Sequence, residues 1–176
     1  MIFTIGHSTR KLEELVNLLK TNNVRLLVDV RTIPRSRHNP QFNKDELASS
    51  MPKSGICYLH FPRLGGLRHP RKDSTNTAWR NAGFRGYADY METAEFETAL
   101  TELIDMSKKD TLAMMCAEAV YWRCHRSLLS DALLVRGIDV RHILSATKVE
   151  PHRLTSFAKV DGFHLSYPPD QPELDL

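Results

Sequence analysis

The sequence predicts an α/β fold in which a mostly parallel sheet carries helices on both faces. Strand-like and helix-like segments alternate along the chain, and this order favours right-handed crossovers between parallel strands. Residues 24–30 form a nearly continuous apolar run, which suits a strand buried on both faces. The length of 176 residues fits one domain. We therefore expect a single-domain, doubly wound, Rossmann-like sheet of about five strands.

Five segments have the length and apolar content of strands. They lie at residues 1–5, 24–30, 56–61, 112–116 and 140–144. Helical sequence separates them, and helices are expected near residues 12–19, 43–52, 87–91, 96–104 and 124–136. Asn43 with Glu46 has the form of a capping box that opens the second helix. Gly137 is well placed to end the last one.

Two segments depart from this alternation. Residues 62–85 are rich in Gly, Pro and Asn, a composition typical of a functional loop, either ordered or flexible. Beyond residue 145 the pattern fades, and three prolines indicate an extended arm: Pro168, Pro169 and Pro172. We expect residues 1–145 to form the α/β domain and residues 146–176 to form a C-terminal extension packed on the domain or on a neighbour.

The composition is that of an ordinary globular protein, with 41% hydrophobic and 26% charged residues. No apolar run is long enough to span a membrane, and the N-terminus lacks the basic and apolar regions of a secretory signal. The cysteines Cys57, Cys116 and Cys124 are odd in number, which argues against a disulfide framework. We therefore expect a cytoplasmic protein with reduced thiols and no membrane partner.

Positive charge gathers in the first half of the chain. Residues 1–80 hold 14 Lys or Arg against 6 Asp or Glu, whereas residues 81–176 hold 10 against 15. Many of these basic residues fall in expected loops, so their field would lie over one edge of the sheet. Such a field attracts phosphate. The alternative is a solvated basic surface that binds nothing.

Polar side chains follow the carboxyl ends of the expected strands, where open α/β sheets bind their ligands. Taken singly, each has an ordinary structural explanation: Asp29 and Arg31 could form an ion pair, and His7 could cap a helix. Their convergence on one edge of the sheet favours a shared site instead.

The candidate residues divide into two roles. The expected catalytic groups are His7, Asp29, Glu118 and Cys124. The expected groups that bind the substrate anion are Ser8, Arg31, Arg35, His125 and Arg126. A thiol at a helix N-terminus beside His and Arg has a lowered pKa and is a usable nucleophile, which favours Cys124 over the hydroxyl of Ser8. The guanidinium fork suits phosphate, and a helix N-terminus adds partial positive charge.

Cys116 tests two further classes of site. In phosphatases and rhodanese-like sulfurtransferases a strand-end Cys begins a Cys-x5-Arg loop, but Trp122 stands where the Arg is needed and Arg123 comes one position later. The Cys and His residues of this region also miss the paired spacings of zinc sites. A folded site could still collect further histidines around a metal ion, but we expect no cofactor.

Seven stretches of the chain resemble one known family, in the family's order. They are Thr4–Ser8, Val28–Arg31 with Pro34–Ser36, Tyr58 with Leu64–Gly66, Phe84–Met91, Met115–Glu118, Cys124–Arg126 and His142–Ile143. The family they resemble is domain of unknown function 488 (DUF488), with weaker similarity around residues 152–155. The resemblance implies a cytoplasmic, largely prokaryotic α/β domain, and it corroborates the location of the site. It implies no particular reaction.

Two functions are consistent with these residues. We expect an enzyme, a hydrolase or group transferase, that acts on a phosphate-bearing substrate such as a nucleotide or nucleic acid, because carboxylates among arginines would repel phosphate unless they took part in catalysis. The alternative is a non-catalytic nucleotide or nucleic-acid binding module, in which aromatic side chains stack on bases. The pI of about 8.8 is lower than that of dedicated nucleic-acid binders. The oligomeric state does not follow from the sequence.

Overall fold

The structure, a computed structural model, describes residues 1–169, so Pro172 of the expected arm lies outside it. A sheet of six strands forms its centre, in the order β3-β2-β4-β1-β5-β6. The strands are β1 (Ile2–Gly6), β2 (Leu26–Asp29), β3 (Cys57–His60), β4 (Leu112–Cys116), β5 (Val140–Ser145) and β6 (Lys148–Pro151). Strands β1 to β5 are parallel, and β6 pairs antiparallel with β5. The α/β fold with a mostly parallel sheet is confirmed, with one strand more than expected.

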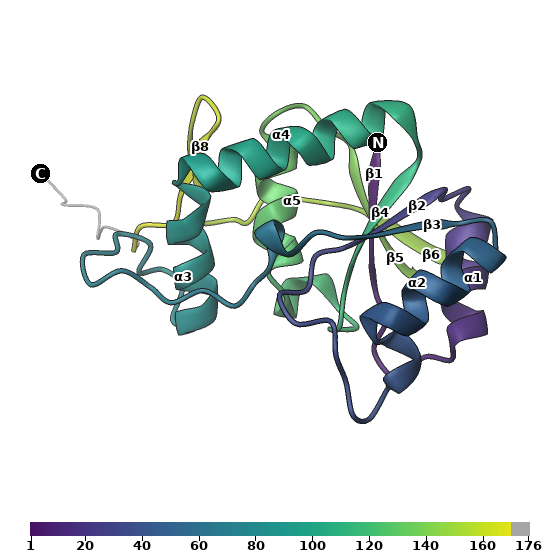
Figure 1. Cartoon of the computed structure of the whole chain (residues 1–176). Coiled ribbons are helices and arrows are strands. Elements are labelled where there is room, and N and C mark those ends of the chain that lie inside the picture. Colours follow the sequence, from purple (N-terminus) through teal and green to yellow (C-terminus); the bar gives the residue numbers. More distant parts are fainter. Residues whose placement is uncertain (170–176) are drawn as a thin grey trace, which may run out of the picture.

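The direction of each crossover decides which face of the sheet its helix covers. From β1 the chain passes through α1 (Leu12–Thr21) to β2 and through α2 (Lys44–Lys53) to β3, towards one edge. It returns through α3 (Ala82–Met91) and α4 (Ala94–Lys109) to β4, and then through α5 (Arg126–Leu134) to β5. Crossovers between parallel strands are right-handed, so a change of direction changes the face that the helix covers. Helices α1 and α2 therefore lie on one face of the sheet and α3, α4 and α5 on the other, as Figure 1 shows.

An apolar core fills each side of the sheet, because the side chains of a strand alternate between its faces. In β1, Ile2 packs in the cluster that contains α4 and α5, whereas Phe3 and Ile5 pack in the cluster with α1 and α2. The same alternation directs Thr4, which is fully buried, towards the face covered by α5. A polar hydroxyl group thus lies inside the core beside α5.

The chain beyond β5 forms ordered structure where the sequence pattern fades. Strand β6 turns back along β5, and β7 (Lys159–Asp161) pairs with β8 (His164–Ser166) in a hairpin. Leu165 and Tyr167 are buried in the core on the side of α3 and α5. Residues 146–169 are therefore tied to the sheet by strand pairing and to the helices by core packing.

The ends of the helices test the caps that the sequence predicts. Gly137 follows α5 with a φ of +75°, which confirms its expected role at the end of that helix. The expected capping box of α2 is wrong, because Asn43 Oδ1 accepts from the Ser36 backbone N–H at 2.7 Å instead. Helix α5 begins at Arg126, so Cys124 lies two residues before it. None of the helices in residues 1–169 is long and apolar enough to cross a membrane.

Candidate functional site

The loops after β1 and β4 meet at the topological switch point of the sheet. The strand order places β1 beside β4, and the chain leaves these two strands in opposite directions. The order differs from the 3-2-1-4-5-6 order of Rossmann sheets because β4, not β1, lies beside β2. The loops continue the strand pairing, since His7 N–H donates to the Cys116 carbonyl at 2.9 Å. A side chain at Gly6 would bring its Cβ within 1.8 Å of the Glu118 carbonyl oxygen, so only glycine permits this approach. Open α/β sheets bind ligands at such a crevice.

A cleft of about 380 Å³ opens at this edge of the sheet. Its lining includes Arg31, Gly66, Phe84, Cys116, Glu118 and Cys124. These residues come from the loops after β2, β3 and β4 and from the start of α3. A second cavity, of about 390 Å³, lies between the α3–α4 junction, α5 and the β7–β8 hairpin, and its lining contains no cysteine. Of the site residues expected from the sequence, this switch-point cleft is lined by Arg31, Glu118, Cys124 and His125.

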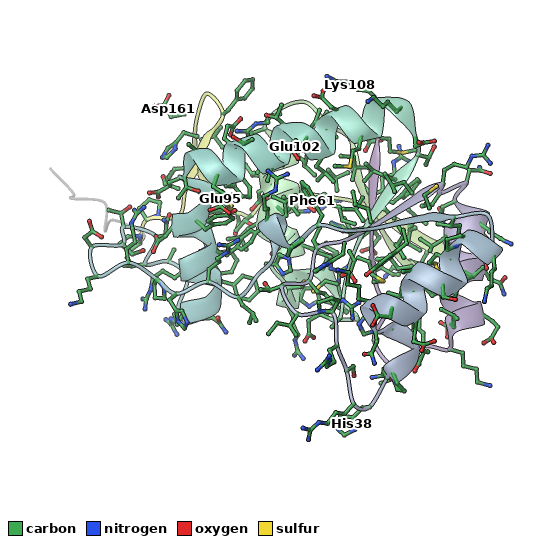
Figure 2. All side chains as sticks on the ribbon, in the orientation of Figure 1. His38, Phe61, Glu95, Glu102, Lys108 and Asp161 are labelled. Atoms are coloured by element: carbon green, nitrogen blue, oxygen red, sulfur yellow. The ribbon has the colours of Figure 1, made fainter. Side chains whose placement is uncertain are left out.

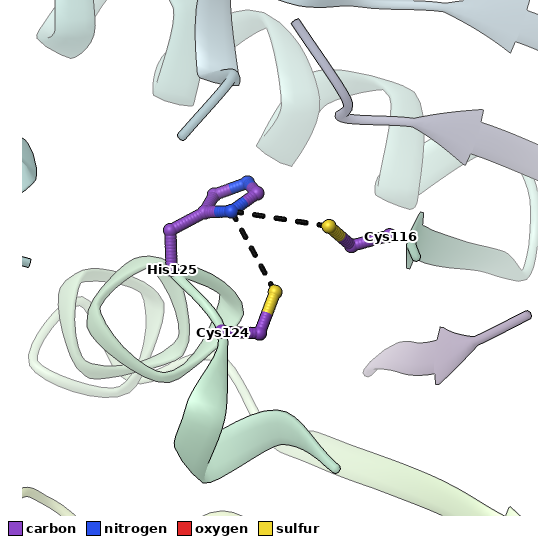
Figure 3. Close-up of side chains that lie close together, drawn as sticks. All are labelled: Cys116, Cys124 and His125. Atoms are coloured by element: carbon purple, nitrogen blue, oxygen red, sulfur yellow. Dashed lines mark hydrogen bonds between the residues drawn. The ribbon is translucent and has the colours of Figure 1, made fainter. Parts of the chain in front are cut away.

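Two thiols and one imidazole converge in this cleft (Figure 3). Nδ1 of His125 lies 3.6 Å from Cys124 Sγ and 4.0 Å from Cys116 Sγ. Cys116 ends β4, whereas Cys124 and His125 immediately precede α5. The loop between β4 and α5 therefore folds back so that its two ends present their side chains to each other.

Arg126 packs directly against Cys124 and is only 1% exposed. Its Nε donates to Cys124 Sγ at 3.4 Å. Its two Nη atoms donate to Thr4 Oγ1 at 3.4 Å and to the Glu118 carbonyl at 2.5 Å. Within residues 1–169 no carboxylate pairs with Arg126. Because a buried guanidinium needs a counter-charge, the sulfur of Cys124 is the group that supplies it.

The two thiols have opposite proton affinities. The pKa of Cys124 lies well below its ordinary value because Cys116 donates a hydrogen bond to its thiolate, and because His125 and Arg126 lie beside it. The pKa of Cys116 lies well above its ordinary value, because that thiol is the donor to Cys124 and because burial disfavours its charged form. Of the two sulfurs, Cys124 is therefore the one that ionises more readily, and Cys116 is the one that keeps its proton and donates it in the hydrogen bond. The thiolate is the nucleophilic form of cysteine.

Arg31 is buried too, but it is paired with a carboxylate. Its Nε and Nη2 donate to the two oxygens of Asp29 at 2.8 and 2.5 Å, and Tyr58 Oη donates to the same carboxylate at 2.8 Å. Its Nη1 donates to His7 Nε2 at 3.0 Å. Burial lowers the pKa of His7 from 6.5 to about 4, so the ring is neutral at neutral pH and Arg31 occupies its lone pair. Asp29 and His7 thus lie behind Arg31 and outside the cleft lining.

The other site residues expected from the sequence divide between the cleft and the surface. Glu118 and His125 line the cleft, and Glu118 is exposed there. Ser8 has a left-handed φ of +49° and is not part of the lining. Arg35 is exposed on the loop after β2, whose outer end carries His38 (Figure 2), and it too is outside the lining. The cleft therefore combines a cysteine of lowered pKa with one accessible carboxylate.

Among residues 1–169, Cys116, Cys124 and His125 form a group that could hold a metal ion, since their ligand atoms all lie within 4.8 Å of one another. Zinc would need bonds of about 2.3 Å to sulfur and about 2.0–2.1 Å to nitrogen. A histidine on a metal almost always donates its other N–H to a second group. Nε2 of His125 is buried and has no such partner in residues 1–169. The cluster therefore fits a reactive thiolate better than a metal centre.

Sequence reasoning finds only part of this cleft. The Cys-x5-Arg test rejects one loop geometry for Cys116, but it cannot show that Cys116 faces Cys124. The usable signal is that both thiols flank one strand-to-helix loop. Arg123 comes one position too late for a Cys-x5-Arg loop, but it lines the cleft as an exposed guanidinium. Gly66 reaches the cleft from the long loop after β3 and Phe84 from the start of α3, and no local pattern shows which way such a loop folds.

Comparison with protein families supports the resemblance seen in the sequence. The family model described as domain of unknown function DUF488 matches residues 11–133. That span contains both thiols of the cleft and both buried arginines. No curated protein and no solved structure matches the chain.

Proposed function

The chain belongs to the DUF488 family, and we propose that it is an enzyme, a hydrolase or group transferase, that uses the Cys124 thiolate on a phosphate-bearing substrate such as a nucleotide or nucleic acid. The observation that carries this proposal is the buried guanidinium of Arg126, which has the sulfur of Cys124 at 3.4 Å and no carboxylate partner within residues 1–169. Proteins stabilise a thiolate in this way where the sulfur reacts. The cleft gives a substrate access to it.

The proposed reaction has two halves. In the first, Cys124 Sγ attacks the phosphorus, the S–P bond forms as the bond to the leaving oxygen breaks, and the Glu118 carboxyl group protonates that oxygen. In the second, water, or an acceptor hydroxyl in a transferase, returns a proton to Glu118 while its oxygen displaces the sulfur. Cys124 leaves as the thiolate with which the cycle began. A side chain that gives and then takes a proton must reach the substrate, and Glu118 is the exposed carboxylate of the cleft.

The positive charge of the cleft supports an anionic substrate. Arg123 lines it as an exposed guanidinium, and within residues 1–169 it forms no ion pair. Helix α5 begins directly after the Cys124–His125 pair, so the positive end of its dipole adds to the field. Arg31 contributes less, because Asp29 neutralises it. Arg123 is therefore the arginine best suited to contact phosphate.

The test is a panel of nucleotides, phosphate esters and short single strands, with binding and product formation both recorded. Cys124→Ser should lower turnover by about a hundredfold or more, because a serine hydroxyl is not ionised at neutral pH. Cys57→Ser is the matched control, since Cys57 is an exposed free cysteine on β3, and it should keep wild-type turnover.

Two results would contradict the proposal in different ways. Binding across the panel with no product from any ligand would favour the non-catalytic nucleotide or nucleic-acid binding module. Product formation that survives Cys124→Ser would leave an enzyme whose nucleophile is not this thiolate. Glu118→Gln separates the roles further, since it keeps the size of the side chain but abolishes proton transfer, so turnover should fall while affinity holds.

A further inference from the structure

A line of buried polar side chains runs from Asp131 of α5, through the segment after β6 and through β5 and β1, to the guanidinium beside Cys124. His152 Nε2 lies 2.8 Å from Asp131 Oδ1, and His152 Nδ1 lies 3.0 Å from His142 Nε2. His142 Nδ1 lies 2.7 Å from Thr4 Oγ1, which accepts from Arg126 Nη1 at 3.4 Å. All five side chains are less than 9% exposed. The line therefore connects a buried cation with a buried anion.

With the rings of His142 and His152 both uncharged, the direction of every hydrogen bond in this line follows from its two ends. Arg126 can only donate, so the Thr4 hydroxyl accepts from it and gives its own hydrogen to His142 Nδ1. His142 then carries its proton on Nε2 and donates to His152 Nδ1. His152 in turn carries its proton on Nε2 and donates to Asp131, which can only accept. Each donor thus meets an acceptor, and both rings are fixed in one tautomer.

The surroundings of His142 exclude water and favour the uncharged form of its ring. The ring of Tyr121 stacks on His142 with a centroid distance of 3.4 Å and an interplanar angle of 7°. The other oxygen of Asp131 accepts from Tyr167 Oη at 2.9 Å. Burial, and after it the neighbouring His152 and Arg126, lower the pKa of His142 from 6.5 to about 3, so the ring is uncharged at neutral pH. Satisfied polar networks of this kind hold their members in one geometry.

We propose that Thr4, His142, His152 and Asp131 are positioning residues that hold Arg126 against the sulfur of Cys124. The inference deepens the proposed function, on which it rests in taking Cys124 as the reacting group. It also assigns a role to the chain beyond β5, since His152 follows β6 and completes the line. The family match ends at residue 133, so this part of the apparatus lies beyond it.

A matched pair of variants at one position tests the proposal. Thr4→Val removes the hydroxyl at nearly constant shape, whereas Thr4→Ser keeps the hydroxyl and removes a methyl group. In a Cys57→Ser background, the rate at which iodoacetamide alkylates Cys124 is measured by mass spectrometry as a function of pH. Thr4→Val should move the midpoint of this profile up by about half a pH unit and slow alkylation below the midpoint about threefold. Thr4→Ser should keep the wild-type midpoint, although it leaves a small cavity.

A second pair separates positioning from general loss of stability. Asp131→Asn removes the anion at the far end of the line, and Asp89→Asn makes the same change at a buried carboxylate of α3 that accepts from Ser74 and Asn76. If the line positions Arg126, Asp131→Asn raises the alkylation midpoint and Asp89→Asn leaves it in place. Direct electrostatics has the opposite sign, because loss of a negative charge favours the thiolate.

The outcomes distinguish this inference from the proposed function, because alkylation needs no substrate. An unchanged midpoint in folded Thr4→Val, or a lowered one in Asp131→Asn, would overturn the positioning role. Equal shifts in Asp131→Asn and Asp89→Asn would do so as well. A shift confined to Thr4→Val and Asp131→Asn supports the inference even if the panel yields no product. Circular dichroism of each variant establishes that it is folded before its profile is compared.

Discussion

The two buried arginines of the switch point, Arg31 and Arg126, have nearly the same exposure but different partners. Arg31 is held in a fork by both oxygens of Asp29, whereas Arg126 contacts a thiol, a hydroxyl and a backbone carbonyl. Each arginine also has a neutral histidine nearby. His7 bonds Arg31 directly, whereas His142 is connected to Arg126 through the Thr4 hydroxyl. The charge of Arg31 is neutralised by Asp29 without a ligand. The charge of Arg126 is neutralised only when the sulfur of Cys124 is ionised.

This difference indicates a structural role for Arg31 and a chemical role for Arg126 at the same edge of the sheet. A carboxylate that accepts two guanidinium bonds and a tyrosine hydroxyl has little capacity left for a substrate, so Asp29 serves to fix the loop after β2. A thiolate with an arginine behind it and a cleft in front of it keeps its reactive lone pairs towards the substrate. The catalytic groups expected at Asp29 and His7 remain untested as such, but the geometry favours Cys124 and Glu118.

The largest expected effect comes from breaking the complete pair. Asp29→Asn leaves the Arg31 charge buried without a counter-charge, and loss of one partner of a buried ion pair destabilises by about 3–5 kcal/mol. The free energy of unfolding from urea titration measures this loss. Asp45→Asn, an exposed carboxylate in the first turn of α2, is the control and should change stability by less than about 0.5 kcal/mol. A small effect of Asp29→Asn would mean that water already shares the charge of Arg31.

A somewhat smaller effect is expected from acid, through His7, which burial keeps neutral beside Arg31. The folded pKa of His7 is about 4 and its ordinary value is 6.5, so the unfolded state binds a proton first as the pH falls. The stability that neutral His7 contributes is therefore present above pH 6.5 and is lost between about pH 6.5 and 4, by up to about 3 kcal/mol. His7→Gln should flatten the fall in unfolding free energy over this window. An equally steep fall in the variant would assign it to other groups.

The contrast between the arginines also shows how far sequence reasoning reaches. The strand ends after β1, β2 and β4 could be predicted from apolar runs, and parallel order alone brings His7, Arg31 and Glu118 to one edge. Which of these side chains then face the cleft depends on partners far away in the chain, such as Tyr58 for Asp29. The Asp29–Arg31 ion pair is a structural alternative that the sequence offers, and the structure contains it. No local motif shows that Arg126 has no carboxylate partner within residues 1–169.

The region beyond β5 was the least predictable for the same physical reason. Its strands are short and largely exposed, so they have no apolar run from which to recognise them. They form because β6 pairs with the edge of β5 and because Leu165 and Tyr167 fill the core beside α5. His152 acquires its importance only through contacts with His142 and Asp131, which tertiary structure alone brings within reach.

The smallest expected effect comes from Arg126, the arginine that has no carboxylate partner within residues 1–169. Arg126→Met fills a similar volume without the charge, so the Cys124 thiolate loses a cation at 3.4 Å and takes up a proton at higher pH. Alkylation of Cys124 at neutral pH should slow about tenfold, which corresponds to one pKa unit, or about 1.4 kcal/mol. Because the thiolate can be neutralised by protonation, no buried charge is left behind, and stability should fall less than in Asp29→Asn.

Arg31→Met is the matched control for Arg126→Met. It leaves Asp29 buried without its arginine and should destabilise the fold more, while leaving the alkylation rate of Cys124 within about twofold. If the two arginine variants slowed alkylation equally, the thiolate would depend on the general positive field of the cleft rather than on its contact with Arg126, and the distinction between the two arginines would fail.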